Sequence, residues 1–253
     1  MKTRLLRLAA CLLFLLPAAG CASKAASPIP VVEFGRVEGS RQKNLLVLLR
    51  GLGGGVEDFE EYGIVEEVRR RDLPFDIVAP DAHLGYYKSE TLEERLKHDV
   101  IDPARARGYR RIWLAGFSMG GLGCLFYLSK FGSDIDGVIL CSPFLGWPSI
   151  RGELRRAGGV KHWRPEENDP QNWQYLIWSW IKQYQQQGGA GYPPIYLGYG
   201  SDDLLTGDGP ALLAAALPPG RFFTVPGNHD NETFRRIWLG HLDRLENELR
   251  SLP

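Results

Sequence analysis

Apolar runs of strand length alternate along this chain with segments of helical periodicity. Residues 44–49 read NLLVLL, and such a continuous apolar run is typical of a strand buried on both faces of a parallel sheet. The pattern predicts further strands at 31–37, 75–79, 111–115, 137–141, 194–199 and 222–225. It predicts helices at 59–71, 91–106, 119–131, 210–216 and 232–249. We therefore expect an α/β domain, with helices on both faces of a mostly parallel sheet.

One stretch, residues 143–193, breaks the alternation. It holds five of the seven tryptophans, namely Trp147, Trp163, Trp173, Trp178 and Trp180. Asp169 can cap a helix that has Pro170 at its first position. One apolar stripe is predicted on this helix, formed by Trp173, Leu176, Ile177, Trp180, Ile181 and Tyr184.

Two interpretations of this insert stay open. The stripe alone predicts a helix that packs on the core. The aromatic residues Tyr175 and Trp178 lie off the stripe, and they favour a lid over a substrate pocket. On the second interpretation, Trp178 lines the acyl side of that pocket.

The first twenty residues predict a secretory signal. Lys2, Arg4 and Arg7 precede an apolar run at 8–16 that is too short for a permanent membrane span. The ending Ala18-Ala19-Gly20-Cys21 resembles a bacterial lipobox, whose cysteine becomes the lipid-modified first residue. We expect a signal peptide at 1–20, a lipid on Cys21 and a tether at 21–30. A plain secretory signal cut near Ala19 or Ala22 is the alternative.

This resemblance implies a location. A protein with lipid on Cys21 is exported and anchored in the membrane of a bacterial cell envelope, while its folded domain stays in water. The residue after the cysteine is Ala22 and not an aspartate, a pattern that resembles the one that sorts lipoproteins of Gram-negative bacteria to the outer membrane. We therefore expect the domain at 31–253 on the periplasmic side or the surface of the outer membrane.

Charge and cysteine content exclude several classes of protein. Lys plus Arg and Asp plus Glu each number 30, so the formal net charge is zero and no nucleic-acid partner is expected. Beyond the signal and Cys21, only Cys124 and Cys141 remain. No Cys–x–x–Cys or Cys/His spacing suits a metal, and the two thiols are expected to be buried and free, with a disulfide left open.

Gly116-Phe117-Ser118-Met119-Gly120 is a G-x-S-x-G sequence between a predicted strand and a predicted helix. A sharp strand-to-helix turn exposes the serine hydroxyl, and it leaves no room for side chains at Gly116 and Gly120. The N–H of Met119 at the helix start then faces a substrate carbonyl oxygen. Ser118 is the candidate nucleophile. Further upstream, the glycine-rich loop at 50–55 follows a strand and can offer a second N–H donor.

From about residue 31 onward, these motifs resemble the α/β-hydrolase superfamily, nearest its esterases and lipases. In that family the glycine loop often reads His-Gly-x-Gly-Gly, so Leu52 is implied as the second oxyanion donor and Arg50 replaces the histidine. The family places its acid three residues after a glycine at a strand end, which implies Asp203, with Asp202 as competitor. Its histidine loop resembles Gly227-Asn228-His229, which implies His229 as the base.

The other histidines fit the role of base less well. His241 shares a helical face with apolar residues, His98 lies in a charged helix, His162 lies in the insert and His83 follows a strand where it can border the pocket. The combined motifs predict a serine hydrolase for carboxylic esters, with a small-molecule or lipid ester as substrate and no metal or organic cofactor. A peptidase or amidase with the same triad is one alternative. A catalytically silent binding protein of the cell envelope is another.

Overall fold

The computed structural model describes residues 24–35, 42–165 and 172–252. In this part of the chain, seven strands form one sheet in the order β1-β3-β2-β4-β5-β6-β7. They are β1 (Val31–Phe34), β2 (Asn44–Leu49), β3 (Phe75–Pro80), β4 (Arg111–Phe117), β5 (Gly137–Cys141), β6 (Ile195–Gly200) and β7 (Phe222–Val225). Strand β1 runs antiparallel to β3, and the other neighbouring strands pair in parallel. The predicted mostly parallel sheet is confirmed.

Helices follow most of the strands. The α-helices are α1 (Asp58–Glu61), α2 (Ile64–Arg70), α3 (Leu84–Lys88), α4 (Leu92–Leu96), α5 (Asp102–Ala106), α6 (Met119–Phe131), α7 (Pro148–Arg156), α8 (Trp173–Gln186), α9 (Gly209–Ala214) and α10 (Asn231–Arg250). A π-helical segment (Lys97–Ile101) joins α4 to α5, and a short 3₁₀ turn (Gly132–Asp134) follows α6. No helix among the described residues combines the length and the apolar character that a bilayer crossing requires.

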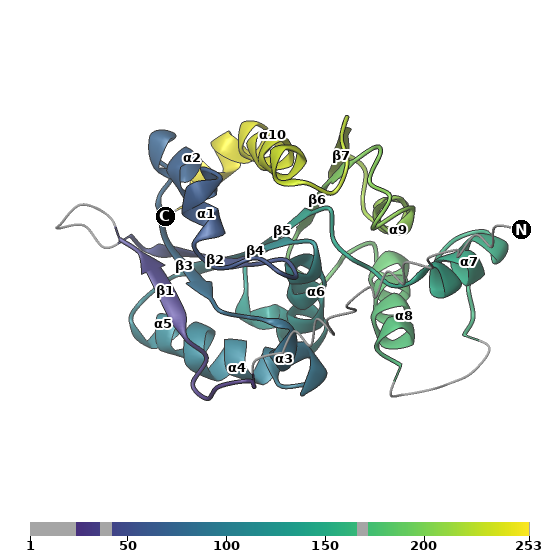
Figure 1. Ribbon diagram of the computed structural model, residues 1–253, viewed down its shortest axis with the longest axis horizontal. Coiled ribbons are helices and arrows are strands. Elements are labelled where there is room, and N and C mark those ends of the chain that lie inside the picture. Colours follow the sequence, from purple (N-terminus) through teal and green to yellow (C-terminus); the bar gives the residue numbers. More distant parts are fainter. Residues whose placement is uncertain (1–23, 36–41, 166–171, 253) are drawn as a thin grey trace, which may run out of the picture.

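The sheet lies between two apolar layers. One layer packs α1, α2 and α10 on the sheet through residues such as Val65, Trp113 and Trp238. The other layer holds α4, α5, α6 and α8 and includes Leu45, Val47 and Leu125. Figure 1 shows the first group of helices above the sheet and α3 to α6 below it. Alternate residues of β2 face the two layers, which explains why its whole sequence is apolar.

Strand register brings four loops to one edge of the sheet. Gly116 of β4 pairs with Leu49 of β2 and with Leu140 of β5, so these strands end side by side. Gly200 of β6 pairs likewise with Val225 of β7. In open parallel sheets, ligands bind at the carboxyl ends of the strands. The loops after β2, β4, β6 and β7 carry the glycine-rich segment, Ser118, Asp203 and His229 respectively.

Two predicted helices differ in their continuity. The predicted helix at 59–71 is interrupted between α1 and α2, where Gly63 adopts a left-handed φ of 72° that a helix interior excludes. The predicted helix at 91–106 is continuous but contains the π-helical segment. Helices α3 and α7 lie in stretches for which the apolar pattern predicted no helix.

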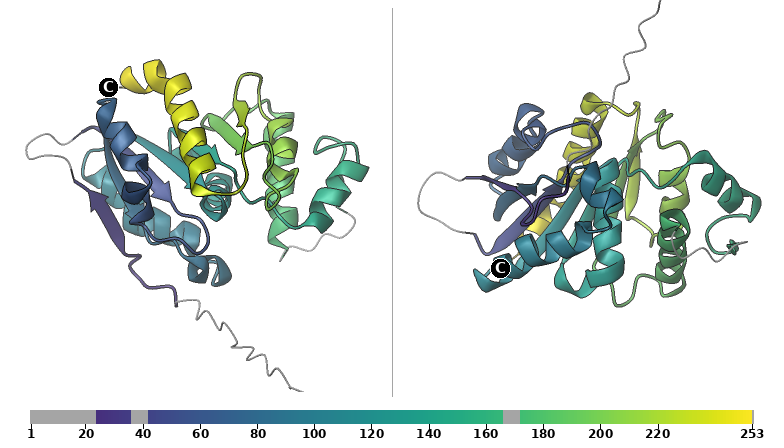
Figure 2. Two further views of the ribbon diagram at one scale, coloured as in Figure 1. Left: turned by 45° about the horizontal axis from the view of Figure 1, so that its top comes forward. Right: turned by 60° about the horizontal axis from the view of Figure 1, so that its bottom comes forward.

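The insert between β5 and β6 forms α7 and α8. Figure 2 shows that these helices lie at the β6–β7 end of the sheet, away from β1. Helix α8 begins at Trp173, and the Asn172 side chain caps it by accepting from the Gln174 N–H at 3.1 Å. The predicted cap by Asp169 and Pro170 lies outside the described residues.

The predicted stripe on α8 is confirmed at Ile177, Trp180, Ile181 and Tyr184, which are buried, and wrong at Leu176. Leu176 is 52% exposed, whereas Trp178 is fully buried and its indole donates to the Leu145 carbonyl at 2.8 Å. The buried face of α8 is therefore wider than the predicted stripe and includes Trp178 as well. The helix buries Trp178 because the segment after β5 passes beside it and offers an acceptor for the indole N–H. Packing on the core, and not pocket lining, is therefore the role of Trp178.

Candidate active site

Ser118 occupies the turn between β4 and α6. Its φ of 53° and ψ of −116° lie outside the regions that L-residues normally adopt. The backbone of the turn is held on three sides: Ser118 N–H donates to the Cys141 carbonyl at 3.0 Å, and its carbonyl accepts from Gly121 and Phe144, each at 3.0 Å. Such strain costs on the order of 1–3 kcal/mol and persists where the surroundings over-determine it.

Two glycines let this turn close. A Cβ on Gly116 would overlap the backbone of Gly120, and a Cβ on Gly120 would overlap the Leu49 carbonyl at the end of β2. The absence of room for side chains at both positions, expected from the motif, is thus confirmed. Gly51 passes close by as well, since a Cβ there would lie 3.4 Å from the Ser118 Cβ. The glycine-rich loop is therefore packed against the candidate nucleophile.

The structure brings Ser118, His229 and Asp203 into contact. His229 Nε2 lies 2.8 Å from Ser118 Oγ, and His229 Nδ1 lies 2.7 Å from Asp203 Oδ2. The two partners of the imidazole come from positions 111 and 26 residues away in the chain. The ring of Phe234 packs edge-on against the imidazole, with centroids 4.9 Å apart. Both ring nitrogens are thus occupied and the ring plane is fixed.

Asp203 is buried but remains a carboxylate. Burial favours its neutral form, yet the hydrogen bond from His229 and those from Thr206 outweigh burial and lower the pKa of Asp203. A carboxylate can only accept, so Nδ1 of His229 carries the proton and Nε2 is free to accept from the Ser118 hydroxyl. With a depressed folded-state pKa, Asp203 stabilises the fold above its ordinary pKa, and this contribution is lost as pH falls through the lowered value.

Asp202 has different partners. Its side chain is exposed, and it accepts hydrogen bonds from the Ser201 hydroxyl at 2.9 Å and from the Gly227 N–H at 3.1 Å. It therefore ties the loop after β6 to the loop that carries His229, while Asp203 alone of the two contacts the imidazole.

Of the two predicted oxyanion donors, Leu52 lines the cavity beside Ser118 and Met119 directly follows Ser118 in the chain. Met119 is the first residue of α6, where a backbone N–H has no partner within the helix. Leu52 lies in the glycine-rich loop, and its side chain is 65% exposed. A cavity of about 220 Å³ opens beside Ser118, and Leu52, Ser118 and His229 all line it. None of its described lining residues belongs to the insert, so the expectation that Trp178 lines this pocket is wrong.

Arg50 stands where the family pattern has a histidine. Its Nε donates to Asp81 Oδ1 at 2.9 Å, and its Nη1 donates to the Gly54 carbonyl. Asp81 is held in turn, because its N–H donates to the Pro30 carbonyl at 2.8 Å. The arginine therefore holds the glycine-rich loop through the Gly54 carbonyl. The loop remains supported although an arginine replaces the histidine of the family pattern.

Arg151 is a residue of this site that the sequence did not indicate. It belongs to α7, is 8% exposed, and donates to the Thr206 carbonyl. Thr206 N–H donates in turn to Asp203 Oδ1 at 3.0 Å. Gly207, with φ of 53°, has no room for a Cβ beside the guanidinium. The insert thus contacts the loop that carries the acid. No local signal could mark Arg151, because its partner lies 55 residues away.

We expect Arg151→Met to lower kcat by about ten- to a hundredfold with little change in KM, since a shift of the acid loop misplaces the imidazole. Arg151→Lys restores part of the loss because it keeps one donor. The matched control is Arg155→Met. Arg155 lies on the same helix as Arg151, is exposed, and pairs with Asp208 at 3.1 Å. Steady-state kinetics of the three variants decide, and equal kcat for Arg151→Met and Arg155→Met would contradict the prediction.

The remaining histidines and cysteines lie elsewhere. His241 is buried, and burial lowers its pKa to about 3 while it contacts the Leu140 carbonyl, so it is a neutral core residue. His83 Nδ1 caps α3 by accepting from Gly85 N–H. Cys124 and Cys141 are buried and free, and burial raises the pKa of both thiols. Cys21 lies outside the described residues. Within those residues, no three His, Cys, Asp or Glu side chains form a group suited to a metal ion.

Comparison with known proteins supports the fold. The sequence model of the alpha/beta hydrolase fold family matches residues 44–169. No curated protein matches the chain in sequence. Among solved structures, a ferulic acid esterase is similar over 83% of this chain and 87% of its own, with TM-score 0.58 and 19% identity.

Two further structures have a comparable likeness. A monoacylglycerol lipase of Paleococcus ferrophilus aligns over 85% of this chain and 99% of its own, with TM-score 0.54 and 18% identity. Fluorophosphonate-binding serine hydrolase F of Staphylococcus aureus aligns over 87% of this chain and 88% of its own, with TM-score 0.56 and 15% identity. At such identities the likeness is one of fold.

Proposed function

This chain is an α/β-hydrolase by fold, and we propose that it is a serine hydrolase that cleaves carboxylic esters. The observation that carries the proposal is the unbroken hydrogen-bonded path from Ser118 Oγ through His229 to Asp203, with contacts of 2.8 and 2.7 Å. A serine hydroxyl is a weak nucleophile without a base in contact, and this path supplies one.

In the proposed reaction, Ser118 Oγ attacks the ester carbonyl carbon while His229 Nε2 takes the hydroxyl proton. The carbonyl π electrons move to the oxygen, which the N–H groups of Met119 and Leu52 stabilise. Collapse of this intermediate breaks the bond to the alcohol, and His229 returns its proton to the leaving oxygen. Water then repeats the sequence on the acyl-enzyme and releases the acid. Asp203 holds the imidazole tautomer throughout and stabilises the imidazolium.

Ester cleavage is the activity best supported by the similar structures. A ferulic acid esterase and a monoacylglycerol lipase share the fold. The proposal is tested by labelling the purified full-length protein with a small alkyl fluorophosphonate and by measuring hydrolysis of p-nitrophenyl butyrate. Labelling and turnover that both depend on Ser118 support it. A protein that binds esters without turnover is a silent member of the fold, and faster cleavage of the matched p-nitroanilide identifies an amidase.

We also propose that Cys21 carries a lipid that anchors the enzyme in a membrane of the bacterial cell envelope. The proposal rests on the sequence ending Ala18-Ala19-Gly20-Cys21. We expect Cys21→Ser to abolish incorporation of radioactive palmitate and to release the protein from the membrane fraction. Cys124→Ser, which removes a buried thiol, is the matched control and keeps the label. Equal labelling of wild type and Cys21→Ser would remove the anchor and leave the hydrolase proposal untouched.

A further inference from the structure

The cavity beside Ser118 has an aromatic, apolar floor. Phe59, Ile64 and Phe117 line it and are nearly buried, with exposed fractions of 4%, 3% and 6%. The rings of Phe59 and Phe117 lie 5.5 Å apart and tilted, and Phe234 meets Phe117 edge-on at 5.9 Å. Aromatic rings favour edge-to-face and offset contacts with another ring, and they also bury aliphatic carbon. This floor therefore suits a single aromatic ring or a short chain.

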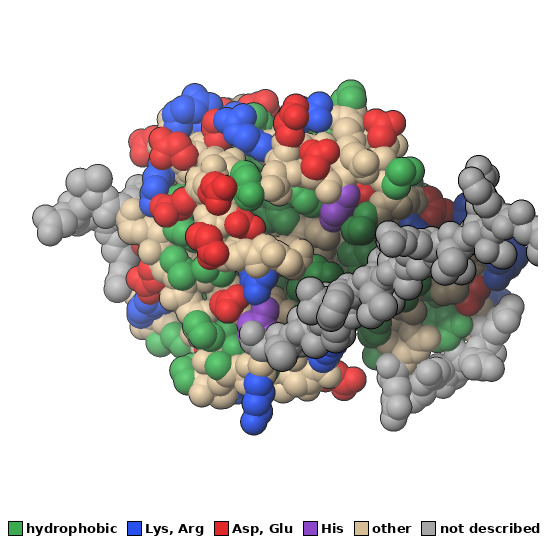
Figure 3. All heavy atoms as spheres, viewed as in Figure 1, with side chains coloured by type: hydrophobic (Ala, Val, Ile, Leu, Met, Phe, Trp, Pro, Cys, Tyr) green, Lys and Arg blue, Asp and Glu red, His purple; other side chains and the backbone are tan. Residues whose placement is uncertain are grey.

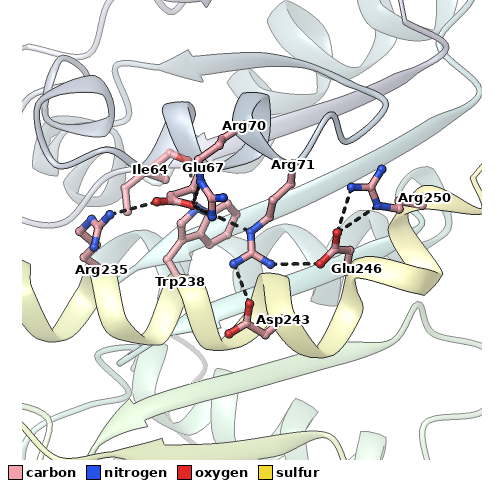
Figure 4. Close-up of polar contacts among 9 residues, drawn as sticks. All are labelled: Ile64, Glu67, Arg70, Arg71, Arg235, Trp238, Asp243, Glu246 and Arg250. Carbon is pink, nitrogen blue, oxygen red and sulfur yellow. Dashed lines mark hydrogen bonds and ion pairs between the residues drawn. The ribbon is translucent and has the colours of Figure 1, made fainter.

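Helices α2 and α10, which carry Ile64 and Phe234, are joined by several polar contacts. The Trp238 indole of α10 donates to the Ile64 carbonyl of α2 at 3.0 Å (Figure 4). The ion pairs that join these helices are Glu67–Arg235 at 3.0 Å, Arg71–Asp243 at 2.6 Å and Arg71–Glu246 at 3.3 Å. Glu67 and Arg71 have side chains only 10% exposed, while their partners Arg235, Asp243 and Glu246 are 46%, 64% and 35% exposed, so each pair is shielded from solvent on one side. The walls that hold Ile64 and Phe234 are thus fixed in relation to each other, and the cavity has a set width.

Its volume indicates how large a group it can enclose. At roughly 30 Å³ for each water-sized group, a cavity of about 220 Å³ holds about seven non-hydrogen atoms. A benzoyl group or a hexanoyl chain fills that space. A lauroyl chain leaves about half of its carbons outside, where they gain little from burial.

The rim of the cavity is negatively charged. Asp58 and Tyr62 line it, and Glu61 lines the adjacent surface groove, which shares Tyr62 with the cavity. The charge of Glu61, followed by burial and the charge of Asp58, raises the pKa of Tyr62. Arg50 lines the cavity as well, but it is paired with Asp81. Figure 3 shows acidic side chains gathered over α1 on this face. An anionic group is therefore repelled at the entrance.

The loop after Asp203 lies beside the loop of His229, since Leu204 N–H donates to Asn228 Oδ1 at 3.2 Å. The loop after Asp203 exposes Leu204 and Leu205, which are 85% and 55% accessible, and neither lines the cavity. The alcohol that receives the proton from His229 can thus depart over this surface. The acyl part, which stays on Ser118 between the two chemical steps, then occupies the cavity.

From these features, and resting on the proposed serine hydrolase function, we propose that the cavity is an acyl subsite for compact, uncharged acyl groups. A single aromatic ring or an aliphatic chain of about six carbons fills it. Long-chain and anionic acyl groups are poor substrates.

A panel of p-nitrophenyl esters tests this subsite. With full-length protein, kcat/KM is expected to rise about fourfold for each added methylene until hexanoate and then to level off or fall. Benzoate is expected to exceed 4-carboxybenzoate at least tenfold at low salt, with a ratio that shrinks as salt is added. A steady rise through laurate, or equal rates for the two benzoates at low salt, would overturn the proposal.

Two variants enlarge the cavity from different helices. Ile64→Ala and Phe234→Ala are each expected to move the chain-length maximum from hexanoate toward octanoate. If one of them fails to fold, the other carries the test. The matched control is Leu176→Ala, an exposed apolar residue of the insert that does not line the cavity, and it leaves the profile unchanged.

Two outcomes separate the subsite from the function on which it rests. Fluorophosphonate labelling of Ser118 reports the nucleophile without regard to acyl length. Wild-type protein that is not labelled contradicts the hydrolase itself. In the other outcome, wild-type protein is labelled, but the chain-length limit appears in a panel of acetate esters varied in the alcohol. That result overturns only the assignment of the cavity to the acyl group.

Discussion

Ser118→Ala and His229→Ala are each expected to reduce kcat for p-nitrophenyl butyrate by on the order of 10⁴- to 10⁶-fold. Ser118→Ala removes the attacking oxygen, and His229→Ala leaves the hydroxyl without its only base. Because the two residues act as one unit, the double variant is expected to be no worse than either single one. Initial rates at saturating ester, with background hydrolysis subtracted, give the measurement.

Neither substitution is expected to unfold the protein. Ser118 holds a strained backbone in place through its main-chain contacts, and alanine keeps those contacts. Thermal unfolding of wild type and both variants provides the control. A Ser118→Ala protein that keeps a tenth of the wild-type rate would refute the assignment of the nucleophile, whatever its stability.

Asp203→Asn is expected to lower kcat by on the order of 10⁴-fold, because an amide presents the wrong partner to Nδ1 and stabilises the unproductive imidazole tautomer. The neighbouring Asp202→Asn is the matched control. Its carboxylate accepts from the Gly227 N–H at 3.1 Å, and the amide oxygen of asparagine can still accept that bond. We therefore expect a loss of less than about tenfold for Asp202→Asn.

The rank of the two variants in kcat, measured with the same ester at the same pH, decides which carboxylate orients the imidazole. If Asp202→Asn were the more damaging change, the contact of 2.7 Å between His229 Nδ1 and Asp203 would have no catalytic meaning. If both were mild, the imidazole would be oriented by other groups, and Phe234 packed on its ring would be the first to examine.

Much of the fold was predictable because its signals are local. The run 44–49 is apolar at every position, and it forms a central strand with a parallel neighbour on each side. The helix predicted at 119–131 has those bounds in the structure. The interruption at Gly63 was harder to predict, because the apolar periodicity continues across it while the backbone turns left-handed.

The insert shows where local pattern stops being informative. Apolar residues cover more than one face of α8, so periodicity alone admits several buried faces. The choice of Trp178 over Leu176 depends on the Leu145 carbonyl, which accepts the indole N–H. Local pattern does not predict the cavity either, because its lining residues Ile64 and Phe234 come from helices far apart in the chain.

The sequence by itself determined the fold class, the strand-to-helix turn at Ser118 and the need for glycine at positions 116 and 120, because each depends on a few neighbouring residues and on backbone sterics. Only the tertiary structure decided which carboxylate contacts His229, that Arg50 braces the glycine-rich loop, and that Arg151 supports the loop of Asp203. The contacts His229–Asp203, Arg50–Asp81 and Arg151–Thr206 join residues 26, 31 and 55 positions apart, and their geometry exists only once the sheet has brought its strand ends to one edge.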